Sequence, residues 1–409
     1  MRIFFLPASF YFKIFAAEFH HSVKPLKGKE KPLRIAVNTR LLIRNRLEGI
    51  GWFTFETLKR ITTAHPEVEF YFIFDRKPDS LFLFAPNVKP VVVGPPARHP
   101  LLYIIWFEWS VRRVLYRLKP DLFLSPDGYL SLGSRIPSLA VMHDLNFEHF
   151  PGDLPLTDSL HYRWFFPRFA AKASRIATVS QFSKEDIVSQ YHVAPEKVDV
   201  VYNGANEAFA PIEDVVADQI RQRYTQGQPY FLFVGSLHPR KNLARLFSAF
   251  DLFRSQTNRP VKLVVVGQKK WWTKPIREAF DGMVCKDEVV FCGRLNSTEL
   301  HQVTAAALAI TYVSYFEGFG IPILEAFRCG VPVITSNVTS MPEVAGDAAL
   351  LVNPYDILSI AQAMETIAED ENLRKSLINK GLERAKLFSW DKTAQSLWES
   401  MMRAINHPI

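Results

Sequence analysis

The most constraining feature of this sequence is the run from Tyr315 to Thr335, YFEGFGIPILEAFRCGVPVIT, where glycines and prolines punctuate a short apolar segment. Gly318 and Gly320 lack a Cβ atom and permit a tight loop. Pro322 suits the first helical position, where its missing N–H costs nothing, and Gly330 can follow the end of the helix. The apolar residues after Gly330 are typical of a buried strand. The run therefore predicts a glycine loop, a short helix and a strand, in that order.

The start of this helix is a candidate ligand site. Free backbone N–H groups at a helix N-terminus, reached through a glycine loop, bind anions such as phosphate. Glu317 precedes the loop and Glu325 is expected in the first helical turn, so both carboxylates should face the opening of the same site. Carboxylates accept O–H hydrogen bonds, which suits sugar hydroxyls better than phosphate oxygens. We therefore expect a ligand that is both phosphorylated and polyhydroxylic, such as a nucleotide sugar. The plainer alternative is a simple turn, with Glu317 solvated and Glu325 favouring the helix dipole.

The pattern around the two glutamates, E-G-F-G-[IL]-P-x-x-E-A followed by G-x-P-V-I-x-S, resembles the signature of the retaining GT-B glycosyltransferases of family 4. The matching residues are Glu317, Gly318, Phe319, Gly320, Pro322, Glu325, Ala326, Gly330, Pro332, Val333 and Ile334. The resemblance implies an α/β fold of the GT-B type, in which two Rossmann-like domains with doubly wound parallel sheets face a central cleft. Tyr315-Phe316 departs from the more usual Leu-Tyr, which is expected to alter sugar contacts without removing the carboxylate.

A second segment, GSLHPRKNL from Gly235 to Leu243, is similar to the family's G-x-x-x-x-R-K-N-L. Arg240 and Lys241 are adjacent cations at a predicted helix start, which suits stabilisation of a leaving pyrophosphate. The alternative is two exposed cations in front of a helix. The resemblance implies that Arg240, Lys241 and the helix start near Gly320 take the leaving-group charge in place of a metal. It also implies that Glu317 holds the sugar hydroxyls and Glu325 the ribose. The expected donor site is completed by Gly235, Gly318, Phe319, Arg294 and Leu295, the last two where the family reads the base.

Two elements of the first half are expected to face the same cleft. A strand, the glycine loop containing Gly49 and Gly51, and a helix to about residue 63 form the layout of a phosphate-approaching turn. His143 ends a predicted strand, the position where open α/β sheets place ligand contacts. The resemblance places Gly49 and Gly51 toward the donor phosphates and the acceptor, and His143 near the transferred sugar. A structural role is the alternative for the histidine.

The resemblance implies retaining hexose transfer from a nucleotide-diphosphate sugar to a glycan or lipid-linked oligosaccharide acceptor in surface polysaccharide synthesis. The loop at 49–51 together with His143-Asp144-Leu145 resembles the mannosyltransferases of the family, so GDP-mannose is favoured over UDP-sugars. No residue is an evident nucleophile, which favours a front-face route. A nucleotide-sugar epimerase of the same fold and an inactive nucleotide-sugar-binding protein are the alternatives. A retaining glycosidase fits less well, because Arg240 and Lys241 would be superfluous for a neutral glycoside.

Apolar runs alternate with helical segments along the whole chain, which predicts parallel sheets covered on both faces. The predicted strands are residues 33–38, 69–74, 89–93, 121–125, 138–142, 175–179 and 198–202, then 229–234, 261–267, 288–293, 308–313, 331–335 and 348–352. We expect a first domain at 33–208 and a nucleotide-sugar-binding domain at 209–388. A C-terminal helix at 389–409 should pack back on the first domain, after an N-terminal leader at 1–32. Capping patterns predict helix starts at Ser183–Asp186 and at Asn296–Glu299.

The formal net charge of +8 favours anionic partners. No zinc-type Cys/His spacing and no basic aromatic platform for single strands is found, so neither a metal site nor a nucleic acid partner is expected. No apolar run is long enough to span a bilayer. The aromatic leader fits an interfacial or a disordered segment, and the basic aromatic helix at 102–118 fits a membrane surface or the core. The predicted location is cytoplasmic, at the inner face of the cytoplasmic membrane.

Overall fold

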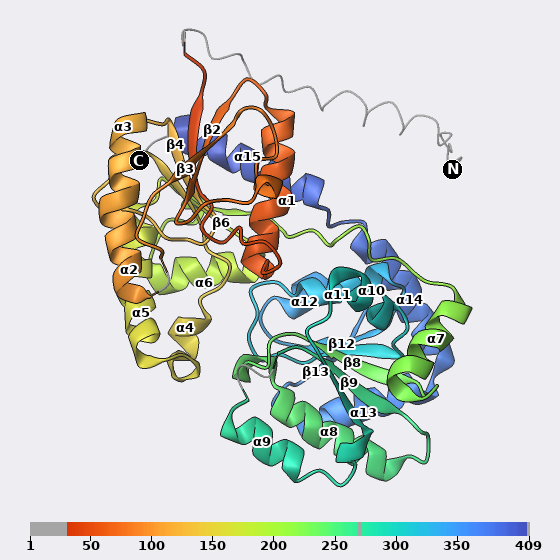
Figure 1. Cartoon of the computed structure of the whole chain (residues 1–409). Helices are drawn as coiled ribbons and strands as arrows, with labels where there is room; N and C mark the ends of the chain where they lie inside the picture. Colours follow the sequence, from red (N-terminus) through yellow and green to blue (C-terminus); the bar gives the residue numbers. More distant parts are fainter. Residues whose placement is uncertain (1–30, 98, 269–271, 407–409) are drawn as a thin grey trace, which may run out of the picture.

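The computed structural model describes residues 31–97, 99–268 and 272–406, which form two α/β domains (Figure 1). The first holds a parallel sheet of seven strands in the order β3-β2-β1-β4-β5-β6-β7, and the second a parallel sheet of six in the order β10-β9-β8-β11-β12-β13. The strands are β1 (Arg34–Asn38), β2 (Glu69–Phe74), β3 (Val88–Val92), β4 (Leu122–Ser125), β5 (Ser138–Val141), β6 (Arg175–Thr178), β7 (Val198–Val200), β8 (Tyr230–Val234), β9 (Lys262–Val266), β10 (Val289–Gly293), β11 (Ala309–Tyr312), β12 (Val333–Ser336) and β13 (Leu350–Val352). The predicted fold class is confirmed.

Helices cover both sheets (Figure 1). Those of the first half are α1 (Gly49–Ala64), η2 (Ser80–Phe82), α2 (Pro100–Ile105), the π-helical turn η3 (Trp106–Val111), α3 (Arg112–Leu118), α4 (Asn146–His149), η4 (Pro151–Asp153), α5 (Leu156–Lys172), α6 (Gln181–Tyr191) and η5 (Pro195–Lys197). Those of the second half are α7 (Asp214–Thr225), η6 (Pro239–Lys241), α8 (Leu243–Gln256), α9 (Lys274–Asp281), η8 (Lys286–Glu288), α10 (Ser297–Ala305), α11 (Ile321–Arg328), α12 (Met341–Ala345), α13 (Ile357–Glu369), α14 (Glu371–Ala385) and α15 (Trp390–Asn406).

Every predicted strand is present, with ends that differ by at most two residues from those expected. The reason is that the inner strands are buried on both faces, as in β4 and β5, so they read as continuous apolar runs. The leader predicted at 1–32 lies almost entirely outside the described residues. No helix in the described part of the chain has the length and apolar character to cross a membrane.

One predicted helix start is wrong. Helix α6 begins at Gln181, and its cap is Ser180, whose hydroxyl accepts a hydrogen bond from the Ser183 N–H at 3.0 Å. Ser183 is therefore inside the helix, not at its cap, because β6 ends early enough for Ser180 to take the extended capping conformation. The predicted box of Asn296 and Glu299 is confirmed.

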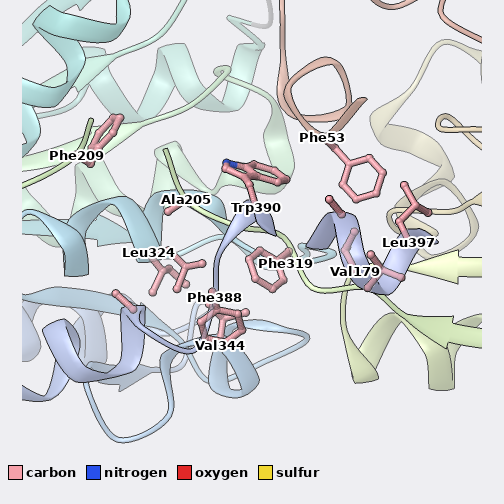
Figure 2. Packing of buried hydrophobic residues seen from close by; sticks show 14 of the residues in the cluster. Phe53, Val179, Ala205, Phe209, Phe319, Leu324, Val344, Phe388, Trp390 and Leu397 are labelled. Carbon is pink, nitrogen blue, oxygen red and sulfur yellow. The ribbon is translucent and has the colours of Figure 1, made fainter. Parts of the chain in front are cut away.

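The chain passes between the two domains twice, and the two passages touch. Helix α15, drawn in blue, lies against α1 of the first domain (Figure 1). A Cβ atom added at Gly204 in the first passage would collide with the backbone N of Trp390 in the second. Arg60 of α1 pairs with Asp391 at 2.6 Å and with Glu207 at 3.5 Å, so it contacts both passages. Figure 2 shows Trp390 buried at this crossing, and its ring lies 6.4 Å from that of Phe53.

Candidate active site

The centre of the site is a buried cluster of Glu317 with two cations. Glu317 follows β11 and is only 5% exposed, while Arg240 and Lys241 lie in the turn η6 after β8, the neighbouring strand. The Arg240 guanidinium and the Lys241 ammonium each lie 2.6 Å from a different oxygen of the Glu317 carboxylate. Lys241 also donates to the Tyr312 hydroxyl at 2.7 Å. Residues far apart in sequence are thus brought together at the carboxyl edge of the second sheet.

The charges of Glu317, Arg240 and Lys241 influence one another's protonation. Burial alone would raise the pKa of Glu317, but the charges of Arg240 and Lys241 lower it to about 2. Burial lowers the pKa of Lys241 to about 8, against the opposing effect of Glu317. The cluster therefore carries a net charge of one positive unit near neutral pH, and Lys241 loses its proton as the pH rises through about 8. Such a cluster can bind an anion.

The glycine loop and the helix behind it have the predicted form, with one correction. Gly320 is the N-cap of α11 and has a φ of +105°, and Gly330 follows the helix with a φ of +66°. The helix begins one residue before Pro322, so Glu325 is its fifth residue. The prediction that Glu325 lies in the first turn is wrong.

Glu325 stands apart from the charged cluster. Its side chain makes no hydrogen bond or ion pair with any of the described residues, and burial raises its pKa to about 7. Near neutral pH this carboxyl is therefore partly protonated, and it can both donate and accept hydrogen bonds. A ligand hydroxyl would supply the partner that the protein does not.

Replacing Glu325 with glutamine is expected to stabilise the protein at pH 8. The folded-state pKa of about 7 exceeds the ordinary value of 4.5, so the stability from this carboxyl is present below pH 4.5 and is lost as the pH rises through 7. A neutral amide removes that loss, which at pH 8 amounts to roughly 3 kcal/mol. Denaturant unfolding at pH 4.5 and pH 8 measures it. The exposed Glu371→Gln is the control and should change little; equal effects of both variants at pH 8 would contradict the prediction.

The first domain meets the glycine loop directly. A Cβ atom added at Gly318 would collide with the carbonyl oxygen of His143 and lie 2.9 Å from the Asp144 Cβ. The Ser180 hydroxyl donates to the Gly318 carbonyl at 2.7 Å, and the Ser183 hydroxyl is 3.3 Å from the same oxygen. The loop after β11 is thus held against the ends of β5 and β6. These contacts bring His143, at the end of β5, next to the loop that carries Glu317.

Glu343 of α12 joins the domains at a second point. Its two carboxylate oxygens accept hydrogen bonds from the backbone N–H groups of Gln181, at 2.7 Å, and Phe182, at 3.0 Å. These are free N–H groups of the first turn of α6, so a carboxylate from the second domain caps a helix of the first. The backbone of Glu343 is itself fixed, because Arg384 donates to its carbonyl at 2.6 Å. No role was predicted for Glu343. Its position after Pro342, at the start of a helix, was the sequence feature that could have indicated one.

Replacing Glu343 with glutamine should loosen the closed arrangement. The amide keeps the shape but replaces two charge-assisted hydrogen bonds at a helix N-terminus, worth about 1–2 kcal/mol, so turnover should fall about tenfold. Small-angle scattering should show a larger radius of gyration. Glu185→Gln on the exposed side of α6 is the matched control. Unchanged scattering and turnover for Glu343→Gln would show that this cap does not hold the domains.

The other predicted residues lie as follows. Gly49 and Gly51 are in the first turn of α1, whose amino-terminal end points toward the second domain in Figure 1. Gly235 has a φ of +152°, and a Cβ atom there would contact the Lys241 side chain. Phe319 is buried, with its ring 5.7 Å from that of Phe388, so its side chain belongs to the core. Arg294 and Leu295 follow β10, with Arg294 exposed, and the structure places neither of them in the Glu317 cluster.

His143 is held by the first domain, where its Nε2 lies 2.9 Å from the Pro126 carbonyl oxygen. Burial lowers its pKa, so the ring is neutral near pH 7. Sequence reasoning missed Tyr312, Ser180 and Ser183, since a tyrosine inside a strand and serines near a helix start are common structural residues. Across the described ranges, no three His, Cys, Asp or Glu side chains are placed to share a metal ion.

Comparison with known proteins agrees with this geometry. Residues 48–209 match the family described as Glycosyltransferase Family 4, and residues 217–384 match Glycosyl transferases group 1. The chain is 29% identical over 377 residues to O-antigen chain mannosyltransferase B of Escherichia coli, covering 87% of this chain and 96% of that protein. Two solved structures are similar: sucrose-phosphate synthase from Thermosynechococcus elongatus (TM-score 0.72, 19% identity, 90% of this chain and 98% of that chain) and Anabaena Alr3699/HepE in complex with UDP-glucose (TM-score 0.70, 18% identity, 90% and 99%).

The fold is the two-domain GT-B architecture, and the family matches define the chain as a glycosyltransferase. Within that class, the family matches to both domains and the similarity to an O-antigen mannosyltransferase identify the family. The chain belongs to the group 1 glycosyltransferases of family 4 and is mannosyltransferase-like.

Proposed function

We propose that this enzyme transfers mannose, with retention, from GDP-mannose to a glycan or lipid-linked oligosaccharide during synthesis of a surface polysaccharide. The observation that carries the proposal is the similarity to O-antigen chain mannosyltransferase B, which extends over nearly the whole of both chains. Anabaena Alr3699/HepE has been solved with UDP-glucose, so a UDP-sugar is the alternative donor.

The charged cluster supports a defined sequence of contacts. Without donor, Glu317 neutralises one of the two cations beside it. The diphosphate of an arriving donor competes for the N–H donors of Arg240 and Lys241, and thereby frees carboxylate lone pairs of Glu317 for the sugar hydroxyls. Donor binding and sugar orientation are then coupled, because binding of the diphosphate releases the Glu317 carboxylate that orients the sugar. Glu325, whose side chain has no hydrogen bond or ion pair with the described residues, takes the ribose hydroxyls.

In the proposed reaction the bond from the anomeric carbon to the diphosphate oxygen breaks, and the acceptor oxygen bonds to the same face of that carbon. The acceptor proton passes to an oxygen of the leaving diphosphate, so no enzyme nucleophile is needed. Arg240 and Lys241 stabilise the negative charge that develops on the leaving group. Metal independence is part of the proposal, and a covalent sugar–enzyme intermediate trapped by mass spectrometry would overturn the route.

Thermal unfolding with GDP-mannose, UDP-glucose, UDP-N-acetylglucosamine, GDP and UDP, all in EDTA, tests the donor. We expect stabilisation by the guanosine compounds, about 2.7 kcal/mol at a ligand concentration one hundred times Kd. It should be lost in Arg240→Ala and kept in Arg223→Ala, an arginine on α7 outside the cluster. Stabilisation by the uridine compounds instead would overturn the GDP-mannose assignment. Binding without transfer to any acceptor would favour an inactive binding protein, and a changed sugar without acceptor would favour an epimerase.

A further inference from the structure

Two neighbouring helical segments of the first domain expose the same kind of apolar stripe. Leu101, Ile105 and Trp109 follow one another at intervals of four along α2 and η3, and all three are exposed. Leu156, Leu160 and Trp164 repeat this spacing along α5, again exposed. Trp109 is 75% and Trp164 60% exposed. Residues four apart lie on one face of a helix, so each segment presents a row that ends in a tryptophan.

The exposed residues are not part of the hydrophobic core. The other side of the first segment is already buried by Trp106, Phe107, Val111, Val114 and Leu115. The core on this side of the domain is therefore formed without Leu101, Ile105 or Trp109. Two exposed rows of leucine, isoleucine and tryptophan side chains on adjacent helices indicate an interaction surface.

The exposed charged residues of both segments are basic, and Asp158 of α5 is half-buried. Arg112, Arg113, Arg117 and Lys119 follow Trp109, and all are exposed. The Arg168 guanidinium lies 3.7 Å from the centre of the Trp164 ring. The acidic residue of the first segment, Glu108, is turned inward and accepts hydrogen bonds from the N–H groups of Leu132 and Gly133. Leucine and tryptophan beside arginines is the composition of helices that lie on anionic membranes.

The two segments lie side by side. The ring of Tyr103 in α2 lies 5.9 Å from that of His161 in α5, so the helices pack against each other. Figure 1 shows α2, α3 and α5 along the same outer side of the first domain. We call the exposed residues Leu101, Ile105, Trp109, Arg113, Tyr116, Arg117, Leu156, Leu160 and Trp164 the α2–α5 surface.

We propose that the α2–α5 surface binds an anionic phospholipid bilayer, with Trp109 and Trp164 at the level of the headgroups. The apolar stripe supplies burial of hydrophobic area, and the arginines supply attraction to acidic headgroups. The sequence left two roles open for the segment 102–118, namely packing in the core and contact with a membrane surface. In this proposal one face of the segment packs in the core and the opposite face contacts lipid. The proposal goes beyond the donor and acceptor proposed above and depends on neither, since binding to vesicles needs no turnover.

Sedimentation of the full chain with vesicles tests the proposal. We expect binding to phosphatidylcholine mixed with phosphatidylglycerol, weaker binding to phosphatidylcholine alone, and loss at high salt. Trp109→Ser with Trp164→Ser should weaken binding about tenfold or more, and so should Arg113→Glu with Arg117→Glu. The matched controls lie on the second domain: Val215→Ser with Val284→Ser, both exposed apolar residues, and Lys274→Glu with Lys375→Glu, which changes the net charge by the same amount.

A position-specific readout complements the affinities. Brominated lipids should quench the fluorescence of the wild-type protein more than that of Trp109→Phe with Trp164→Phe, which keeps the apolar surface. Unfolding midpoints establish that each variant is folded. Unaltered binding by the α2–α5 variants, equal losses in the controls, or no binding of the wild type would each overturn the proposal. So would a concentration-dependent dimer that the tryptophan variants abolish, because the surface would then belong to self-association.

Discussion

Replacing Glu317 with glutamine is expected to lower the rate of sugar transfer roughly 10²–10³-fold, the range found when one group that stabilises a transition state is removed. The carboxylate lies 2.6 Å from both Arg240 and Lys241 and is the group proposed to hold the sugar hydroxyls. At a pH below the pKa of Lys241, removing the carboxylate charge leaves the cluster with two positive units instead of one. Donor affinity should therefore be kept or increased while transfer is lost, and this split between Kd and kcat is the discriminating result.

The same substitution should change the pH dependence. Because Glu317 raises the pKa of Lys241 against the effect of burial, its loss moves that pKa below about 8. In the wild type we expect kcat/KM to fall as the pH rises through about 8, and in Glu317→Gln donor binding should fall at lower pH. Glu288→Gln is the control, since Glu288 also pairs with a lysine, Lys262 at 2.7 Å, outside the cluster. Transfer within about threefold of wild type in Glu317→Gln would contradict the assigned role.

Gly318→Ala is expected to abolish transfer to a similar extent by a different cause. The new Cβ would collide with the carbonyl oxygen of His143, and backbone atoms on both sides leave no flexible side chain to move away. The loop and the end of β5 must separate, which removes the hydrogen bonds from Ser180 and Ser183 as well. Because a misplacement of about 1 Å can cost 10²-fold in rate, we expect a loss of at least that size.

Donor binding distinguishes this effect from the loss of a catalytic group. Gly318→Ala should leave nucleotide-induced stabilisation by GDP largely intact, since Arg240 and Lys241 are untouched, while scattering shows more open domains. Gly152→Ala is a matched control, because a Cβ atom there meets nothing within 4 Å. A crystal structure of Gly318→Ala with unchanged domain contacts, or full activity, would refute the prediction.

Sequence patterns predicted those parts of the molecule that depend on local chemistry. The strands followed from apolar runs. Glu317, Arg240 and Lys241 were expected in one donor site, but the ion pairs between them were not predicted. The position of Glu325 was missed by one residue, since Gly320, and not the residue before Pro322, caps the helix.

Contacts between the domains could not be predicted in this way. Glu343 caps α6 across a separation of 161 residues or more, and nothing in the local sequence of either segment indicates the other. The same holds for Ser180, whose hydroxyl is shared between its own helix and the Gly318 carbonyl. Such contacts depend on how the two domains are oriented, and the periodicity of apolar residues in the sequence does not predict that orientation.

The packing of α15 on α1 has a consequence for biosynthesis. The second domain is continuous from α7 to α14, whereas the first is completed by α15, which the ribosome makes only after the whole second domain. Domains generally fold as units while the chain is being synthesised. Here the domain that is synthesised first is completed last, when α15 packs on α1. Until then the residues of α1 that pack on α15 remain exposed, and a truncation before Trp390 would leave them uncovered.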